Sequence, residues 1–452
     1  MPLSADDVVD RARELMGVRV RERPRLDRIH EYLRDDPDRR LSGLPPTVPA
    51  DVHRLARFSR VNMLKFVVNA RVQSMFVDGL RLPRQADNVD AWQVWQANRL
   101  DARQIGVHRA ALAYGAAYVT VLPGRRGDES MPVLRGASPR QLTVAYSPDD
   151  DDWPSYALEQ RRNGTWRLID SEAVYTLADV DDDTDRFRLV GEPAVHGLDV
   201  CPVVRIRETD DLDDEVQGIV DPLTPLQDQI NITTFGLLTA QHYQAFRQRW
   251  VIGWAAPTEE ASLKASASKL WSFEDPEVKV GEFGQVDLGG YINSREASIR
   301  HLATISQTPA HELLGQLVNL SAEALAAAEA SHRRALAENQ TVAGESWEQA
   351  LALAGEIRGV EVPLDAEVRW RDTESRSLAQ TADALGKIAT MLGVPPAELW
   401  EMLPGVTQQQ VERWRAAAAE GDAFARMNAL LEQQASVLAD TPPAEPPAPV
   451  PA

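Results

Sequence analysis

The chain has 452 residues, of which 68 are Asp or Glu and 48 are Lys or Arg, so its formal net charge is −20. This balance argues against a DNA-binding regulator, because a firm grip on DNA phosphates needs clustered cations. The negative net charge remains compatible with an acidic surface past which DNA slides without adhering. The length is too great for one ordinary hydrophobic core and predicts two or three packed regions.

The cysteine content and the hydropathy of the sequence narrow the class of protein further. Cys201 is the only cysteine, which rules out an intrachain disulfide and a thiolate zinc cage within one chain. Because it lies beside the apolar Val203 and Val204, we expect a small buried side chain rather than a nucleophile. The sequence contains no run of about eighteen apolar residues and no secretory signal, so we expect the protein to stay in the cytoplasm where it is made.

The first 75 residues predict an arm followed by a helix. Residues 1–50 give a short helix near Asp6 to Met16, an Arg-rich stretch and a Pro-rich loop. From Asp51 to Met75 apolar residues recur at helical spacing and form one broad apolar face. The residues expected on the opposite face are Arg54, Arg57, Arg60, Lys65 and Arg71. The Arg-rich segments near Arg19 to Arg28 and Arg54 to Arg71 could touch nucleic acid, but we expect them to pair with the acidic excess of this chain or of a neighbouring copy.

Helices then give way to strands. Helices are predicted from Val89 to Asn98, with Trp92 and Trp95 three residues apart, and from Ala102 to Tyr114. Beyond them, short β-branched or aromatic runs alternate with turn residues and predict strands at 118–121, 141–146, 155–160, 165–169, 174–177, 187–190 and 203–206. Asn163-Gly164 separates two of these runs and is a strong hairpin signal.

The best-defined helix start lies in the segment DPLTPLQDQIN. Thr224 is the expected N-cap, Pro225 the first helical residue, and Gln227 completes a capping box. This helix could extend through Trp250 to Gly253, a span of about 39 Å at ~1.5 Å per residue.

Further helices are expected in the second half of the chain. One covers 289–306 and is broken or kinked at Thr308-Pro309, and an Ala-rich helix runs from a capping Ser321 to about Trp347. Two later helices are predicted, in SLAQTADALGKIATMLG and in TQQQVERWRAAAAEGDAFARMNALLEQQ. The Pro-rich end, 441–452, cannot form a packed core and predicts a disordered tail.

Motifs for catalysis and cofactor binding are weak. The chain has no GxxxxGK[ST] phosphate loop and no GxGxxG fingerprint, so we expect no nucleotide hydrolysis and no cofactor. His311-Glu312 begins like HExxH, but Gly315 stands where the second histidine of a zinc site belongs. The residues that match ligand positions of a calcium loop are Asp181, Asp183, Asp185 and Glu192, although Arg186 replaces its essential glycine. We therefore predict no metal site and favour a solvated acidic turn.

Several segments, in this order, resemble the portal proteins of long-tailed siphophages. They are HEYLRDDP, RLARFSRVNMLKFVVNARVQSMFVDGLR, WQANRLDARQIGVHRAALAYGAAYVTV, SPRQLTVAYSPD, EVQGIVDPLTPLQDQINITTFGLLTAQHYQAFRQRWVIG, ISQTPAHELLGQLVNLSAEALAAAEASHRRALAENQ and GESWEQALALA. Together they cover most of residues 28–355.

The resemblance implies an α+β, mainly helical fold with a wing, a two-helix stem, a small α/β clip, a channel loop and a helical crown. The expected division is 1–50 N-terminal arm, 51–224 wing with its β-rich part at 132–206, 225–254 first stem helix, 255–288 clip, 289–307 second stem helix, 308–360 channel loop and wing helix, 361–440 C-terminal wing or crown, and 441–452 tail. The candidate channel loop consists of Gln316, Leu317, Val318, Asn319 and Leu320, none of which carries a charge that would trap a phosphate.

The resemblance also implies the partners. The chain would form a ring of about twelve copies at one capsid vertex, built from head-to-tail contacts, and would let double-stranded DNA pass. Its expected partners are the large subunit of the terminase motor, the scaffold and major capsid proteins, and head-completion or adaptor proteins, with no membrane involved. The expected location is the virion, and the host cytoplasm during assembly. The alternatives are another virion component, such as a minor head or adaptor protein, and a metal-dependent hydrolase that uses the acidic clusters.

Overall fold

The computed structural model describes residues 1–34, 45, 47–81, 89–124, 131–180, 187–210, 212, 217–244, 249–253, 278–282, 287–315, 322–371, 378–403 and 405–421. The chain divides into two compact units, each assembled from separate stretches of sequence. The first unit takes Met1–Gln73, Ile105–Leu122 and Leu134–Ser346, and the second takes Ser74–Gln104, Pro123–Val133 and the chain from Trp347 onward.

The elements are mainly helical, which confirms the predicted α+β class. The helices are α1 Ala5–Leu33, α2 Ala50–Phe58, α3 Met63–Gln73, α4 Val89–Ala97, α5 Leu100–Tyr114, α6 Thr224–Gln244, α8 Leu288–Ile305, α9 Ala310–Leu314, α10 Ala322–Arg358, α11 Leu378–Leu392 and α12 Pro396–Leu399. The strands are β1 Val77–Arg81, β2 Ala116–Pro123, β3 Pro132–Ala137, β4 Leu142–Ser147, β5 Asp150–Gln160, β6 Trp166–Ile169, β7 Ala173–Asp179, β8 Phe187–Leu189, β9 Ala194–Val195, β10 Val203–Arg207, β11 Arg249–Ile252, β12 Lys279–Glu282 and β13 Glu367–Trp370.

The central sheet of the first unit follows the predicted strands closely. Its order is β4-β5-β6-β7-β8, all antiparallel, with β9 pairing with β7. The predicted Asn163-Gly164 hairpin joins β5 to β6, where Gly164 takes a φ of 83° and Arg161 N–H donates to the carbonyl of Thr165. The left-handed conformation at Gly164 explains why the turn needs glycine there. A second sheet of this unit has the order β10-β2-β3.

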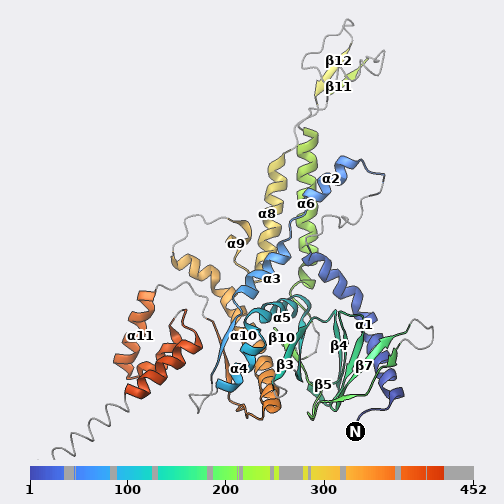
Figure 1. The fold of residues 1–452 in the computed structure, drawn as a ribbon. Coiled ribbons are helices and arrows are strands. Elements are labelled where there is room, and N and C mark those ends of the chain that lie inside the picture. Colours follow the sequence, from blue (N-terminus) through green and yellow to red (C-terminus); the bar gives the residue numbers. More distant parts are fainter. Residues whose placement is uncertain are drawn as a thin grey trace, which may run out of the picture. The chain divides into compact units, whose positions relative to one another are not determined.

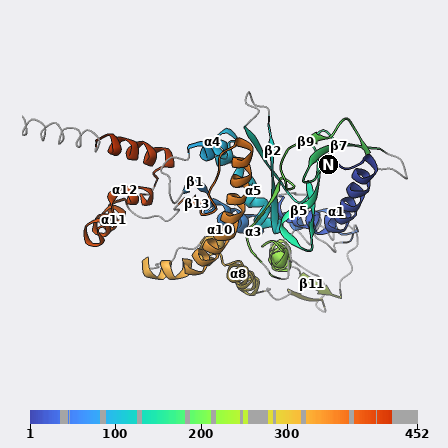
Figure 2. The same cartoon turned by 90° about the horizontal axis from the view of Figure 1, so that it is seen from below.

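Helix α1 covers this sheet and is far longer than predicted. It runs beside β5 and β7 (Figures 1 and 2) and buries Val8, Leu15 and Met16 against Trp166 and Tyr175. The prediction of a short helix was wrong because the Arg-rich stretch continues it. Arginine is a good helix former, and the Pro inside the helix does not end it.

The single helical pattern predicted from Asp51 to Met75 is in fact two helices. Helix α2 ends at Phe58 and α3 begins at Met63. The break is stabilised from outside: the Gln227 side chain accepts hydrogen bonds from Met63 N and Leu64 N and donates to the carbonyl of Val61. A partner so distant in sequence leaves no trace in the local pattern.

The second unit contains a strand pair that the sequence did not predict. Strands β1 and β13 are antiparallel, with Leu80 opposite Val368, and Asp78 pairs with Arg369 at 3.0 Å between Oδ1 and Nε. The core of the second unit includes Trp95 and Trp347, which are both fully buried. Their ring centroids lie 5.0 Å apart in an edge-to-face arrangement. Trp92, three residues before Trp95 in the same helix, stacks on it with ring centroids 5.2 Å apart.

Cys201 has the environment expected from the sequence. It is buried in an apolar cluster of the first unit beside Ile169 and Val203, and burial raises the pKa of its thiol. A thiolate is therefore strongly disfavoured, which fits a packing role. A search of the described helices for one long and apolar enough to cross a bilayer found none.

Candidate functional site

Two long helices of the first unit lie side by side and lead to a small strand pair. Helices α6 and α8 are in contact along their length (Figure 1), and Gly236 of α6 faces the Tyr291 ring of α8. The strand that follows α6 pairs with the strand that precedes α8, and Tyr291 near the start of α8 lies against the second half of α6. The helices are therefore antiparallel, and β11 and β12 lie at the end of the pair where α6 ends and α8 begins.

The start and the end of α6 both differ from the prediction. A 3₁₀ turn at Asp221–Leu223 leads directly into α6, so Thr224 is already helical and donates its hydroxyl to the carbonyl of Asp221. Gln227 does not form a capping box, because its side chain bonds to residues 61–64. The helix does not reach Gly253 either, since β11 begins at Arg249.

The base of α6 is fixed by polar contacts. Tyr32 donates its hydroxyl to Asp228 Oδ2 at 2.6 Å, which joins α6 to α1. Arg25 and Arg28 both pair with Asp221, at 3.5 and 2.7 Å. The prediction that the Arg-rich stretch pairs with acidic residues is confirmed for these two arginines.

Close packing at Gly236 gives a testable consequence. A β-carbon at this position would lie 2.9 Å from Tyr291 Cε1, which is shorter than an ordinary carbon–carbon contact. We expect Gly236→Leu to reduce the free energy of unfolding by about 1 to 3 kcal/mol because the side chain cannot fit between the helices. The matched control is Gly106→Leu in α5, where nothing lies within 4 Å and where the same change should stabilise by ~0.5 to 1 kcal/mol. Thermal unfolding measures both, and equal effects of the two substitutions would contradict the close contact.

The strand pair that joins the two helices along the chain is short and antiparallel. In its backbone register Arg249 lies opposite Glu282, and Ile252 lies opposite Lys279. The indole of Trp250 lies against Gly281, the residue directly opposite it. Most of the predicted clip, 255–288, lies outside the described residues.

Large apolar side chains are exposed on these elements. They are Ile232 on α6, Trp250 and Ile252 on β11, and Ile292 and Ile305 on α8. Single exposed apolar residues are ordinary, but these five lie on one helix pair and its strand pair. Each of them is an exposed apolar position that another protein surface could cover.

The base of α8 rests on a buried polar cluster, formed by Arg71, Asn339 and Glu208 with Ser306 and His108. Arg71 donates from Nη1 to Asn339 Oδ1 at 3.0 Å and from Nη2 to the carbonyl of Ser306, the C-cap of α8, at 2.7 Å. Asn339 Nδ2 donates to the carbonyl of Glu208 at 2.5 Å. The cluster thus connects α3, α8 and α10 with the end of β10.

Arg71 was expected on an exposed face and is instead 4% exposed. The prediction failed because helical spacing shows only that a residue lies off the apolar stripe. Burial of the guanidinium lowers the pKa of Arg71, an effect that the nearby carboxylates of Glu208 and Glu338 oppose.

Glu208 is the acidic member of the cluster. Its Oε1 lies 2.9 Å from His108 Nδ1, and both side chains are buried. Burial raises the pKa of Glu208, while His108 and Arg71 act in the opposite direction. A carboxyl group whose pKa is higher in the folded than in the unfolded protein stabilises the fold fully at low pH, and that contribution is lost as the pH rises through the folded pKa.

Glu208→Gln should therefore change the pH dependence of stability. Near pH 4.5, the reference pKa of the carboxyl group, the variant and the parent should differ least, because the amide resembles the protonated acid. As the pH rises, the melting temperature of the parent should fall relative to that of the variant. Thermal melts across this range measure the difference, with the exposed Glu14→Gln as control. Parallel pH profiles for parent and Glu208→Gln would show that ionising Glu208 carries no cost.

The structure does not describe most of the other sequence-predicted site residues. The candidate channel loop, Gln316 to Leu320, and the acidic residues Asp181, Asp183 and Asp185 lie outside the described residues. The strands predicted to flank the acidic turn are confirmed as β7 and β8. His311 lies in α9, which ends at Gly315 in the left-handed conformation. In the described part of the chain, no three His, Cys, Asp or Glu side chains are grouped to hold a metal ion.

Comparison with known proteins decides the family. The profile of the family described as "Phage portal protein, SPP1 Gp6-like" matches residues 17–423. The chain belongs to this portal protein family. Among curated proteins, the portal protein of Mycobacterium phage L5 is 26% identical over 92% of this chain and 90% of its own length. The portal protein of Mycobacterium phage D29 is 26% identical over 83% of this chain and 82% of its own length.

Solved structures of gene transfer agent particles are also similar to the chain. One virion chain aligns at 15% identity with a TM-score of 0.49, over 78% of this chain and 96% of its own length. A neck chain, from a particle computed with C12 symmetry, aligns at 15% identity with a TM-score of 0.47, over 78% of this chain and 92% of its own length.

Membership of the portal family confirms the resemblance seen in the sequence. The chain is a structural component of a phage particle, and its function is that of a portal at a capsid vertex. The helix pair with its strand pair is therefore the structural feature to examine for that function, rather than a catalytic cleft.

Proposed function

We propose that copies of this chain assemble head-to-tail into a closed ring of about twelve, which serves as the channel for genome packaging and ejection. The observation that carries the proposal is the antiparallel α6–α8 pair with exposed apolar side chains, in a chain of the portal family. Such side chains gain free energy when a neighbouring copy covers them, at roughly 25 cal/mol per Å² of apolar surface.

The parts of the ring are proposed by analogy with the portal family. Residues 225–254, which include α6, and 289–307, which include α8, form the two stem helices, and 255–288 with the preceding β11 form the clip. Residues 51–224 form the wing, 308–360 the channel loop and a wing helix, and 361–440 the crown. The ring itself catalyses no reaction. A separate terminase ATPase docks on the clip and supplies the energy for packaging, while scaffold, major capsid and head-completion proteins contact the ring elsewhere.

Negative-stain electron microscopy of the purified protein tests the ring. We expect closed rings with a central hole, and the proportion of rings should rise with protein concentration. Strictly monomeric particles at high concentration would contradict the proposal. The variant Ile232→Asp/Ile292→Asp should reduce ring formation while leaving the circular dichroism spectrum unchanged, because it places charge on exposed positions of the stem.

The channel loop needs a separate experiment. Deleting Gln316 to Leu320 should leave ring assembly intact and impair DNA packaging, since these uncharged residues are proposed to face the passing DNA. Loss of folding on deletion would show that the loop is misplaced.

A further inference from the structure

A cavity of about 270 Å³ lies between α1 and the connection from β3 to β4 in the first unit. The residues that line it are Arg19, Arg23, Leu26, Asp27, Ser138, Pro139, Arg140, Gln141 and Gln160. Three guanidinium groups face one carboxylate, so the lining is cationic in a chain whose net charge is −20. At ~30 Å³ per water the volume corresponds to roughly nine waters, enough for an acidic side chain to enter.

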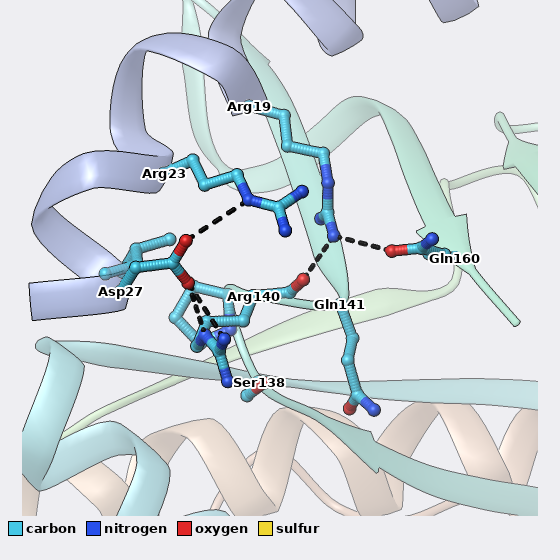
Figure 3. A pocket seen from close by; sticks show the side chains of 9 residues that line it. Arg19, Arg23, Asp27, Ser138, Arg140, Gln141 and Gln160 are labelled. Atoms are coloured by element: carbon cyan, nitrogen blue, oxygen red, sulfur yellow. Dashed lines mark hydrogen bonds and ion pairs between the residues drawn. The ribbon is translucent and has the colours of Figure 1, made fainter. Parts of the chain in front are cut away.

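The cavity already holds one carboxylate of its own chain. Arg140 donates from Nε and Nη2 to Asp27 Oδ1 at 3.0 and 2.8 Å, and Arg23 Nε donates to Asp27 Oδ2 at 3.2 Å (Figure 3). The bond from Arg140 is the largest of the influences that lower the pKa of Asp27. The lining therefore has the geometry to bind a carboxylate.

Arg19 and Arg23 add two more guanidinium groups to the lining beside that of Arg140. Arg19 is 6% exposed, lies over the Trp166 ring, and donates to Gln160 Oε1 at 3.0 Å and to the carbonyl of Arg140. These contacts fix its guanidinium at the wall of the cavity, and Figure 3 shows Arg23 pointing into the same space. A rigidly held arginine loses little conformational entropy when an anion binds.

An acidic turn lies at the other end of the same hairpin. The cavity is at the open end of the β4–β5 hairpin, where Gln160 N donates to the carbonyl of Gln141. The closed end carries four consecutive exposed aspartates, Asp149 to Asp152. No ion pair with Asp149 or Asp151 occurs in the described part of the chain. The ten residue steps along β5 span roughly 30 Å, so the turn cannot reach the cavity of its own copy.

We propose that the Asp149–Asp152 turn of one copy docks into the Arg19–Arg23–Arg140 cavity of the next. The inference rests on the proposed ring, because head-to-tail contacts join two different patches of the same chain. A cationic cavity and an acidic turn at opposite ends of one hairpin are such a pair of patches. The contact adds charge complementarity, which fixes the register between neighbours, to the apolar contacts of the stem.

A mixing experiment tests the contact. One variant removes the positive excess of the cavity lining with Arg23→Glu, and the other removes the negative excess of the turn with Asp149→Lys/Asp151→Lys. Asp150 stays unchanged because its carboxylate accepts hydrogen bonds from Asp152 N and Trp153 N and supports the turn. In an alternating ring of the two variants, half of the contacts join a parental turn to a parental cavity, whereas neither variant alone can form any such contact.

Mass photometry at low salt measures the protein concentration at which half of the subunits are in rings. Each variant alone should need ~10-fold more protein than the parent, and an equimolar mixture should need less than either variant alone but more than the parent. The matched control is Arg21→Glu, an exposed arginine of α1 outside the cavity lining, which should assemble like the parent.

Two results would overturn the docking contact while leaving the ring in place: unchanged assembly of the single variants, or a mixture that assembles no better than its components. If the parent itself forms no rings, the proposed function fails along with the contact.

Discussion

Replacing Arg71 with leucine should lower the free energy of unfolding by about 3 to 5 kcal/mol. The substitution removes the donors to Asn339 and to the carbonyl of Ser306, and it takes away the positive charge of Arg71 from the buried Glu208, which keeps only His108 beside it. Breaking a buried polar cluster by removing one member costs this much because the remaining groups stay desolvated without partners. Denaturant unfolding monitored by circular dichroism measures the loss.

Two further variants distinguish the effect of the hydrogen-bonded cluster from the effect of the positive charge alone. Arg71→Lys keeps the charge but cannot donate to both acceptors as the planar guanidinium does, so it should recover only part of the lost stability. Arg54→Leu, on the exposed face of α2, should change stability by less than about 0.5 kcal/mol. If Arg71→Leu behaves like Arg54→Leu, the cluster does not stabilise the base of α8.

Replacing Trp95 with alanine should have an effect of similar size in the second unit. Trp95 is fully buried between Trp92 and Trp347, and its indole N–H donates to Asp101 Oδ1 at 2.9 Å. Truncating a buried tryptophan costs about 3 to 5 kcal/mol, because apolar contacts are lost and the surroundings fill the cavity only in part. Denaturant unfolding followed by circular dichroism and tryptophan fluorescence measures the change.

The matched control for Trp95 is Trp414 in the same unit, which is 41% exposed and contacts Trp400 at 6.1 Å. Trp414→Ala should cost clearly less, at most about 1.5 kcal/mol, since much of its surface is already in water. Similar losses for the two substitutions would argue against a core centred on Trp95.

Local signals in the sequence predicted local structure well. The strands between 141 and 206 and their Asn163-Gly164 hairpin follow from alternation and turn chemistry, and both recur in the structure. Helix α8 and the break after it follow in the same way from helical spacing and Thr308-Pro309. In each case the information lies within a few residues of the element that it defines.

Errors arose where a distant partner decides the structure. Gln227 fits a capping box by spacing, yet its amide satisfies the backbone of residues 61–64 instead. Arg71 falls on the polar side of a helical pattern but is covered by α8 and α10. β1 and β13 are too short to be predicted alone, because each is a strand only in the presence of the other.

The candidate site, too, was predictable only where the information is local in the sequence. The two helices could be predicted from their own segments, whereas their pairing as a stem was expected only from the resemblance to portal proteins. The arginine cavity could not be predicted, since Arg19, Arg140 and Gln160 come together only through the packing of α1 on the sheet. An excess of arginine near residues 19–28 was the available signal, and it pointed to ion pairs without showing which side chains would line a cavity.

The pairing of β1 with β13 also determines when this protein can finish folding during translation. The strands are separated by about 290 residues, and a ribosome that adds ~5 to 20 residues per second needs roughly 15 to 60 seconds to pass from one to the other. Throughout that interval β1 is an unpaired edge, open to non-native pairing with other nascent chains. The strand pair of the second unit can therefore close only after Trp370 has left the ribosome, and a chain cut short before Glu367 would keep that edge exposed.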